Sequence, residues 1–261
     1  VQWGEENGIY RKSNIYLAKN SVNPNNLEGF KSFKGDDGKI GKIVQSDVVW
    51  TYQNDGNGLN GHRVGSELCL AVNPNNSEQL YLAYQDTSGS GFLNMHLIVS
   101  NDGGDTWQPE LGVFTNVIAP ALAVHKNGTV AFSYTQLEGL NDQRNWVSKI
   151  WQYNPSSGNR CITQFAITKC SKLAEMHQSP KLGDYSGIIA GVDWQNRDQL
   201  VFKGVFAAHN EPNKDNFPNG VHFQRRHDFV ENILLSKNQS GNTYEVPTSV
   251  DPFYFSINCI D

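Results

Sequence analysis

The chain lacks the segments that mark several common classes of protein. Its best apolar run, residues 187–192, is far shorter than the roughly 18 residues that a membrane-spanning helix needs, so no membrane span is predicted. Lysine and arginine together number 21 against 26 aspartate and glutamate residues, and the basic pair Arg225 and Arg226 is not part of a longer basic tract. Because nucleic-acid binding depends on a basic surface that displaces counterions, no nucleic-acid partner is predicted.

Cysteine is scarce, and the four residues present do not have the spacing of a metal site. No C-x-x-C pair occurs, which argues against zinc-ribbon and thioredoxin-like arrangements. Cys161 and Cys170 are close enough in sequence for a local disulfide, whereas the partner of Cys259 stays open. We expect two disulfides in an oxidising compartment rather than four buried free thiols. A signal peptide is not visible at Val1, and a mature secreted protein, extracellular or periplasmic, is expected.

Residues that form turns are plentiful, with 24 glycines and 10 prolines, and short apolar stretches alternate with them. The pattern predicts strands at residues 67–75, 79–85 and 94–100. The same order of three predicted strands recurs at 120–128, 130–134 and 146–151, and again at 187–192, 199–206 and 232–236. Each unit opens on a strand of small apolar residues, which suits an inner position where sheets crowd around an axis.

These repeats, about 50 residues each, predict an all-β fold, a β-propeller of four-stranded antiparallel blades. Five blades are favoured, with residues 48–52 hinting at the fifth, and four or six are the alternatives. We expect one domain over residues 1–261. The C-terminal strand, at about 250–258, is expected to pair with the N-terminal blade and close the ring, because closure removes exposed strand edges.

The most specific motif is S-x-D-x-G-x-T-W at residues 100–107. It predicts a hairpin turn in which the Asp102 carboxylate accepts backbone N–H groups and a glycine takes a conformation closed to other residues. Weaker copies follow at residues 152–158, with Asn154 at the Asp position, and at 236–244, with Asn238 there; the faintest is at 18–20. A repeat at blade spacing around the motif strengthens its interpretation.

This motif and its spacing resemble the Asp box of the sialidase (neuraminidase) superfamily and of bacterial Asp-box propellers. Residues 183–187, Gly-Asp-Tyr-Ser-Gly, resemble a blade opening found in some secreted members. The resemblance implies a propeller that recognises a terminal sugar on a glycan or glycoprotein, with Asp102 in a structural role. The Arg-Ile-Pro signature of sialidases does not occur in this chain, which favours a non-catalytic or divergent member.

Ligands of a propeller meet the loops that lead into its innermost strands, and this geometry selects the candidate site residues. The catalytic candidates are Asp184, Tyr185 and Glu67. The substrate-binding candidates are Arg63, Arg225, Arg226 and Tyr254. Each also has a structural interpretation: a turn cap and a packed ring for Asp184 and Tyr185, a salt bridge between Arg63 and Glu67, and a solvated loop for the arginine pair.

Three functions follow from this set of residues. The favoured one is glycan recognition without catalysis. The alternatives are an exo-acting glycoside hydrolase that uses a central Asp, Tyr, Glu and Arg site, and a scaffold for protein interaction. No cofactor and no metal are predicted. Asn54, Asp55 and Asn57 offer oxygens to calcium, but the bidentate acid of an EF-hand loop is not in place. Residues 56–61 match G-x-G-x-x-G with no following helix, so no dinucleotide site is predicted.

Overall fold

The computed structural model of the chain describes residues 2–7, 10–20, 28–31, 34–36, 38–51, 67–87, 93–139, 143–169, 182, 186–210, 227–228, 233–234 and 249–261. These residues form antiparallel β-sheets, together with a single helical turn, α1 (Glu28–Lys31). The all-β class predicted from the sequence is therefore confirmed. No helix in the described ranges is long and apolar enough to cross a membrane.

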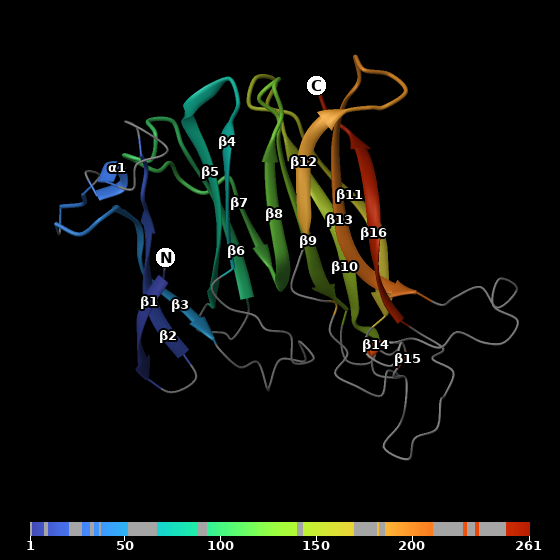
Figure 1. Cartoon of the computed structure of the whole chain (residues 1–261), viewed down its shortest axis with the longest axis horizontal. Helices are drawn as coiled ribbons and strands as arrows, with labels where there is room; N and C mark the ends of the chain where they lie inside the picture. The colour runs from blue at the N-terminus through green and yellow to red at the C-terminus, as the bar shows by residue number, and fades with distance from the viewer. Residues whose placement is uncertain are drawn as a thin grey trace, which may run out of the picture.

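Four sheets make up most of the described chain (Figure 1). The N-terminal sheet has the order β1 (Gln2–Asn7), β2 (Tyr10–Leu17), β3 (Lys42–Thr51). The Asp-box sheet has the order β4 (Leu68–Asn73), β5 (Asn76–Thr87), β6 (Leu93–Ser100), β7 (Gly112–Thr115). The middle sheet contains, in chain order, β8 (Val117–Val124), β9 (Val130–Glu138), β10 (Asn145–Tyr153), β11 (Arg160–Lys169). The C-terminal sheet has the order β12 (Gly187–Val192), β13 (Leu200–Asn210), β16 (Ser249–Asn258).

The middle sheet is covered by a neighbouring sheet on each of its faces. Alternate side chains of β8 point to opposite faces, as strand geometry requires. Leu122 and Val124 join a core cluster with residues of the Asp-box sheet such as Tyr81. Ala121 and Ala123 instead join a cluster with residues of β12, β13 and β16. The first strands β4, β8 and β12 accordingly contact one another in that order.

Two short strands and one irregular strand differ from the sequence prediction. β14 (His227–Asp228) and β15 (Ile233–Leu234) pair with each other, so the described part of the strand predicted at 232–236 pairs with β14 and not with β13. β8 begins three residues before the predicted start at 120, because the strand continues through an irregularity between Ile118 and Ala121. Ala119 there has a φ of 53°, and the following proline is tolerated since a bulge relaxes the ladder.

The C-terminal strand has a different partner from the one expected. β16 pairs with β13 along its whole length, from Val201 opposite Asn258 to Asn210 opposite Ser249. Among the described residues it makes no ladder with the N-terminal sheet, so the expected pairing with the N-terminal blade is not observed. Apolar packing explains the choice: Phe255 is buried in the cluster that also contains Phe202, and Phe253 stacks on Phe206.

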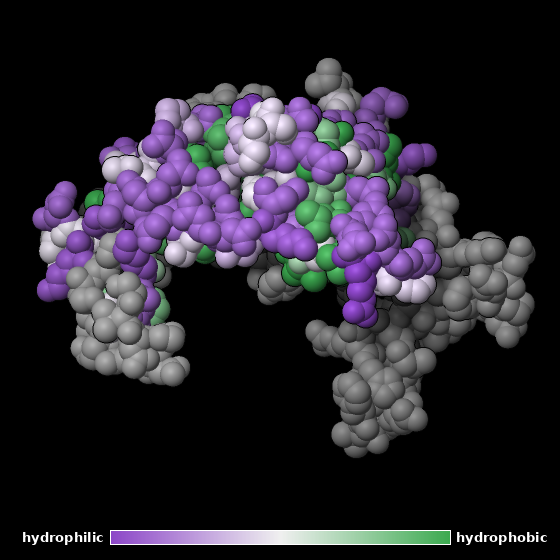
Figure 2. Space-filling model, turned by 90° about the horizontal axis from the view of Figure 1, so that it is seen from above, coloured by the Kyte–Doolittle hydropathy of each residue, from purple (hydrophilic) through white to green (hydrophobic). Residues whose placement is uncertain are grey.

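Tight turns gather at one end of the sheets, which we call the turn end. It carries the connections 73–76, 101–111, 125–129, 154–159 and 193–199, and residues 259–261 lie there as well (Figure 1). Seen from this end, the described surface is largely hydrophilic and the row of sheets follows an arc (Figure 2). At the opposite end β4, β8 and β12 begin, and Glu67 precedes β4 there.

Candidate functional site

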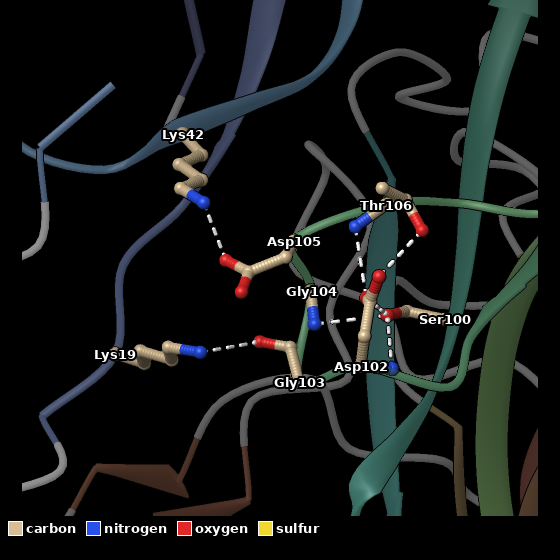
Figure 3. A network of polar contacts seen from close by, with 8 residues as sticks. All are labelled: Lys19, Lys42, Ser100, Asp102, Gly103, Gly104, Asp105 and Thr106. Carbon is tan, nitrogen blue, oxygen red and sulfur yellow. Dashed lines mark hydrogen bonds and ion pairs between the residues drawn. The ribbon is translucent and has the colours of Figure 1, made fainter. Parts of the chain in front are cut away.

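The Asp-box turn, residues 100–107, connects the adjacent strands β6 and β7, as the sequence predicts (Figure 3). The Ser100 hydroxyl accepts the backbone N–H of Gly104 and donates to the Asp102 carboxylate, both at 2.8 Å. The carboxylate also accepts the backbone N–H of Thr106 at 2.8 Å and its hydroxyl at 2.5 Å. These hydrogen bonds, those of Thr106 first, lower the pKa of Asp102 to about 2. Asp102 is thus an ionised anchor of its own turn.

Two glycines give this turn its shape. Gly103 and Gly104 have φ values of 70° and 90°, a region that disfavours residues with a Cβ atom. The backbone N–H of Gly103 donates to the carbonyl of Glu78 at 2.7 Å. A Cβ atom on Gly104 would lie 2.0 Å from a methyl carbon of Leu17, a residue of the N-terminal sheet. The turn therefore needs glycine for its backbone and for the close approach of the neighbouring sheet.

Two lysine side chains, one from β3 of the N-terminal sheet and one from the loop after β2, contact the Asp-box turn (Figure 3). Lys19 Nζ donates to the carbonyl oxygen of Gly103 at 3.1 Å, and Lys42 forms an ion pair with Asp105. The hydrogen bond from Lys42 lowers the pKa of Asp105. Trp107 packs against an apolar cluster that contains Ile15 of β2 and Leu82 of β5. The motif thus contacts a second sheet through Gly103, Asp105 and Trp107, while Ser100, Asp102 and Thr106 bond within the turn.

The turn between β10 and β11 occupies the same place in the middle sheet and corresponds to the predicted weaker copy. Asn154 stands at the Asp position and is buried. Its side-chain oxygen accepts the backbone N–H of Ser156 at 2.9 Å and of Ser157 at 3.4 Å. Gly158, with a φ of 76°, donates its N–H to the carbonyl of Asn154 at 2.8 Å. A neutral side chain therefore organises this turn.

Glu67, a predicted catalytic residue, connects two sheets at the end opposite the turns. One of its carboxylate oxygens accepts the backbone N–H of Ala119 in β8 at 3.0 Å. From the other side of β8, the Ser186 hydroxyl donates to the carbonyl oxygen of Ala119 at 2.6 Å. Ala119, at the irregularity of β8, is thus held by Glu67, which precedes β4, and by Ser186, which precedes β12. This contact gives Glu67 a structural role, as an acceptor for a strained strand.

Tyr254, a predicted binding residue, lies on the outer face of the C-terminal sheet. Its side chain is 63% exposed, and its cross-strand partner Val205 is 50% exposed. Val205 in turn lies opposite Gly187, the last residue of the Gly-Asp-Tyr-Ser-Gly motif. Gly187 and Tyr254 are therefore two strands apart in one row, about 10 Å at the usual strand spacing. Glu67 precedes β4 of the Asp-box sheet, and the middle sheet lies between that sheet and the C-terminal sheet.

The other predicted site residues lie outside the described residues. They are Arg63, Asp184, Tyr185, Arg225 and Arg226. The calcium candidates Asn54, Asp55 and Asn57, the weaker motif copy around Asn238, and Cys170 also lie outside them. Of the described cysteines, Cys69, Cys161 and Cys259 are free thiols, so the structure shows neither of the expected disulfides.

One polar cluster was not foreseen from the sequence. His96 Nδ1 lies 2.5 Å from a carboxylate oxygen of Glu110, its Nε2 lies 3.8 Å from Asp86, and its ring stacks on Tyr84 at 4.9 Å. Burial, followed by the charges of Glu110 and Asp86, raises the pKa of Tyr84 to about 12. Asp86 also accepts the backbone N–H of Val49, at 3.2 Å. Residues spread over three segments form this cluster, and no local pattern connects them.

No set of three or more His, Cys, Asp or Glu side chains in the described part of the chain is arranged to hold a metal ion. No protein-family model matches the chain, and neither a curated protein nor a solved structure matches it significantly.

Proposed function

We propose that the chain is a secreted, sialidase-like Asp-box propeller that binds glycans without cleaving them. The four sheets are its blades, with β4, β8 and β12 as inner strands. Three observations support this architecture: the order of contacts among the first strands, the packing of the middle sheet on both faces, and the Asp-box turn between third and fourth strands. Each is expected when antiparallel sheets are arranged around an axis.

The observation that carries the binding proposal is the row of Gly187, Val205 and Tyr254 on the outer face of the C-terminal sheet. An exposed tyrosine beside a valine and a glycine offers a flat apolar surface, and the ring face of a sugar packs on such a surface. Lys203 and Ser256 lie one row further along on the same face and supply polar groups. We propose that Asp184 and Tyr185, which precede Gly187 in sequence, add contacts to the same ligand.

The position of Glu67 favours binding over hydrolysis. A retaining or inverting glycosidase needs two carboxyl groups that face the scissile bond. One oxygen of Glu67 accepts the backbone N–H of Ala119, so this carboxyl group is engaged in holding β8. We infer that Glu67 is not a member of a catalytic carboxyl pair.

A glycan array tests the proposal directly. We expect the wild-type chain to bind a subset of glycans and the variant Tyr254→Ala to bind them at least about 10-fold more weakly, as for a central aromatic anchor. The matched control is Trp194→Ala, which removes a ring that is 78% exposed in the turn between β12 and β13. Equal binding by wild type and Tyr254→Ala would contradict the proposed surface.

Fluorogenic glycosides distinguish the hydrolase alternative. Turnover that is lost in Asp184→Asn and Tyr185→Phe would replace the binding proposal by an enzymatic one. Absence of both turnover and glycan binding, together with self-association that Tyr254→Ala abolishes, would identify the same face as a protein-interaction surface.

A further inference from the structure

The chain ends at the turn end of the sheets (Figure 1). Polar side chains of the middle sheet's turns hold residues 259–261 there. The Thr129 hydroxyl donates to the carbonyl oxygen of Ile260 at 3.2 Å. Ser157 Oγ and Asn159 Nδ2 both donate to Asp261, at 3.1 Å and 2.9 Å. The segment therefore crosses from the β8–β9 turn to the β10–β11 turn.

The Gln152 side chain bonds to the backbone of the residues before and after Cys259. Its side-chain amide donates to the carbonyl of Asn258 at 3.0 Å and accepts the backbone N–H of Ile260 at 3.2 Å. Gln152 is almost completely buried, and its cross-strand partner on β11 is Cys161. Side chains of such partners lie on one face of the sheet, with Cβ atoms about 5 Å apart. Cys161 therefore lies beside the base of the Gln152 side chain, and Cys259 lies at its amide end.

We propose that Cys161 and Cys259 are a redox-sensitive pair that oxidation joins in a disulfide, which fastens residues 259–261 to the middle sheet. This pairing differs from the local bridge between Cys161 and Cys170 that the sequence suggested. It does not depend on the proposed function, because it concerns the opposite end of the sheets from the Glu67 and Ser186 contacts.

In the reduced form seen here, the Cys259 sulfur faces the Asn127 side chain. Asn127 Nδ2 lies 3.5 Å from the sulfur, and the thiol donates to Asn127 Oδ1 at 3.7 Å. Bonds to a thiol are weak, so they oppose a rotation about χ1 only slightly. Oxidation exchanges this contact for a covalent bond.

The reaction needs a two-electron oxidant, and a small-molecule disulfide such as oxidised glutathione supplies it. One cysteine thiolate attacks this disulfide and releases one glutathione thiol; the second cysteine then displaces the other. The two cysteines lose two electrons to the glutathione disulfide, and their two protons end on the two glutathione thiols. Burial, with a further contribution from the neighbouring Cys259, raises the pKa of Cys161, so the exchange is fastest in mildly alkaline buffer.

Cys69, the third described cysteine, is expected to react slowly in thiol–disulfide exchange. Cys69 lies on β4 in the Asp-box sheet, and burial raises the pKa of its thiol to about 12. A thiol of this kind is protonated in the buffers in which exchange occurs, and it reacts slowly.

Peptide mapping of the full chain tests the pairing. After equilibration in glutathione buffers at about pH 8.5, near the pKa of a free thiol, remaining thiols are alkylated and the protein is digested without reduction. We expect a cross-linked peptide that contains Cys161 and Cys259, absent in the reduced sample and retained in Cys170→Ser. A bridge between Cys161 and Cys170, or alkylation of both Cys161 and Cys259 in oxidising buffer, would overturn the proposal.

Thermal unfolding supplies a second measurement. A bridge between residues nearly 100 positions apart should raise Tm by about 5–10 °C in the oxidised wild type, since it restricts the unfolded chain. The Cys161→Ser variant should show no difference between oxidising and reducing buffer. A rise that persists in Cys161→Ser would assign the effect to another bridge and refute this one.

Discussion

The turns of residues 100–107 and 154–159 hold the same place in neighbouring sheets, between the third and fourth strands, but they are built differently. In the Asp-box turn a charged carboxylate binds Thr106, and two lysines approach from the N-terminal sheet and its following loop. In the middle sheet a neutral Asn154 binds two backbone N–H groups, and the turn holds Asp261 instead. A turn at this place can thus be anchored by a charged or by a neutral side chain, and the Asp-box turn in addition contacts a neighbouring sheet.

The largest difference in stability between the two turns is expected when one methyl group is added to each of them. Gly104→Ala should lower the free energy of unfolding by about 2–3 kcal/mol, because it combines a strained backbone with a clash against Leu17. Gly158→Ala has a similar φ but open space around its Cβ atom, so we expect about 1 kcal/mol. Urea denaturation measures both; equal losses would show that the approach of the N-terminal sheet contributes nothing.

Removal of the neutral anchor should have the next largest effect. Asn154→Ala leaves two backbone N–H groups without their acceptor in a partly buried turn, and we expect a loss of about 1–2 kcal/mol. Because no charge is involved, the loss should be the same at pH 3 and pH 7, values chosen on either side of an ordinary carboxyl pKa of about 4. A loss confined to one pH would contradict a neutral anchor.

The charged anchor should instead affect the pH dependence of stability. The folded pKa of Asp102, about 2, is below its value in the unfolded chain, so its contribution is present above about pH 4 and is lost as pH falls towards 2. Asp102→Asn keeps an acceptor for Thr106 but removes the charge, so it should flatten this part of the curve, with its loss of stability at neutral pH and little difference from wild type near pH 2. The measurement is the free energy of unfolding of wild type and Asp102→Asn as a function of pH from the acid range to neutral, with Asn154→Ala as the control. An unchanged acid slope would contradict the role of the carboxylate.

The exposed ion pair should matter least. Lys42 and Asp105 are both substantially exposed, and water and salt screen such pairs. Lys42→Met should leave the unfolding midpoint nearly unchanged at physiological salt and lower it slightly at low salt. A large loss that is insensitive to salt would assign Lys42 a packing role instead.

Most strands and the Asp-box turn could be predicted from the sequence because they depend on local chemistry. Alternating apolar residues and turn formers located the strands, and the spacing from Ser100 to Trp107 located the hairpin. The partner of the C-terminal strand could not be predicted, because it depends on where Phe255 finds apolar neighbours. The same holds for Glu67: its place before an inner strand was predicted, but its bond to Ala119 arises from an irregularity in β8.

The middle sheet is packed on both faces by neighbouring sheets. Methyl–methyl NOEs test this most directly. We predict contacts from Leu122 to methyl groups of the Asp-box sheet, such as Ala83, and from Ala123, one residue along β8, to Ile188 of β12. Contacts of both β8 residues with the same neighbouring sheet, or none between Ala123 and Ile188, would contradict the arrangement.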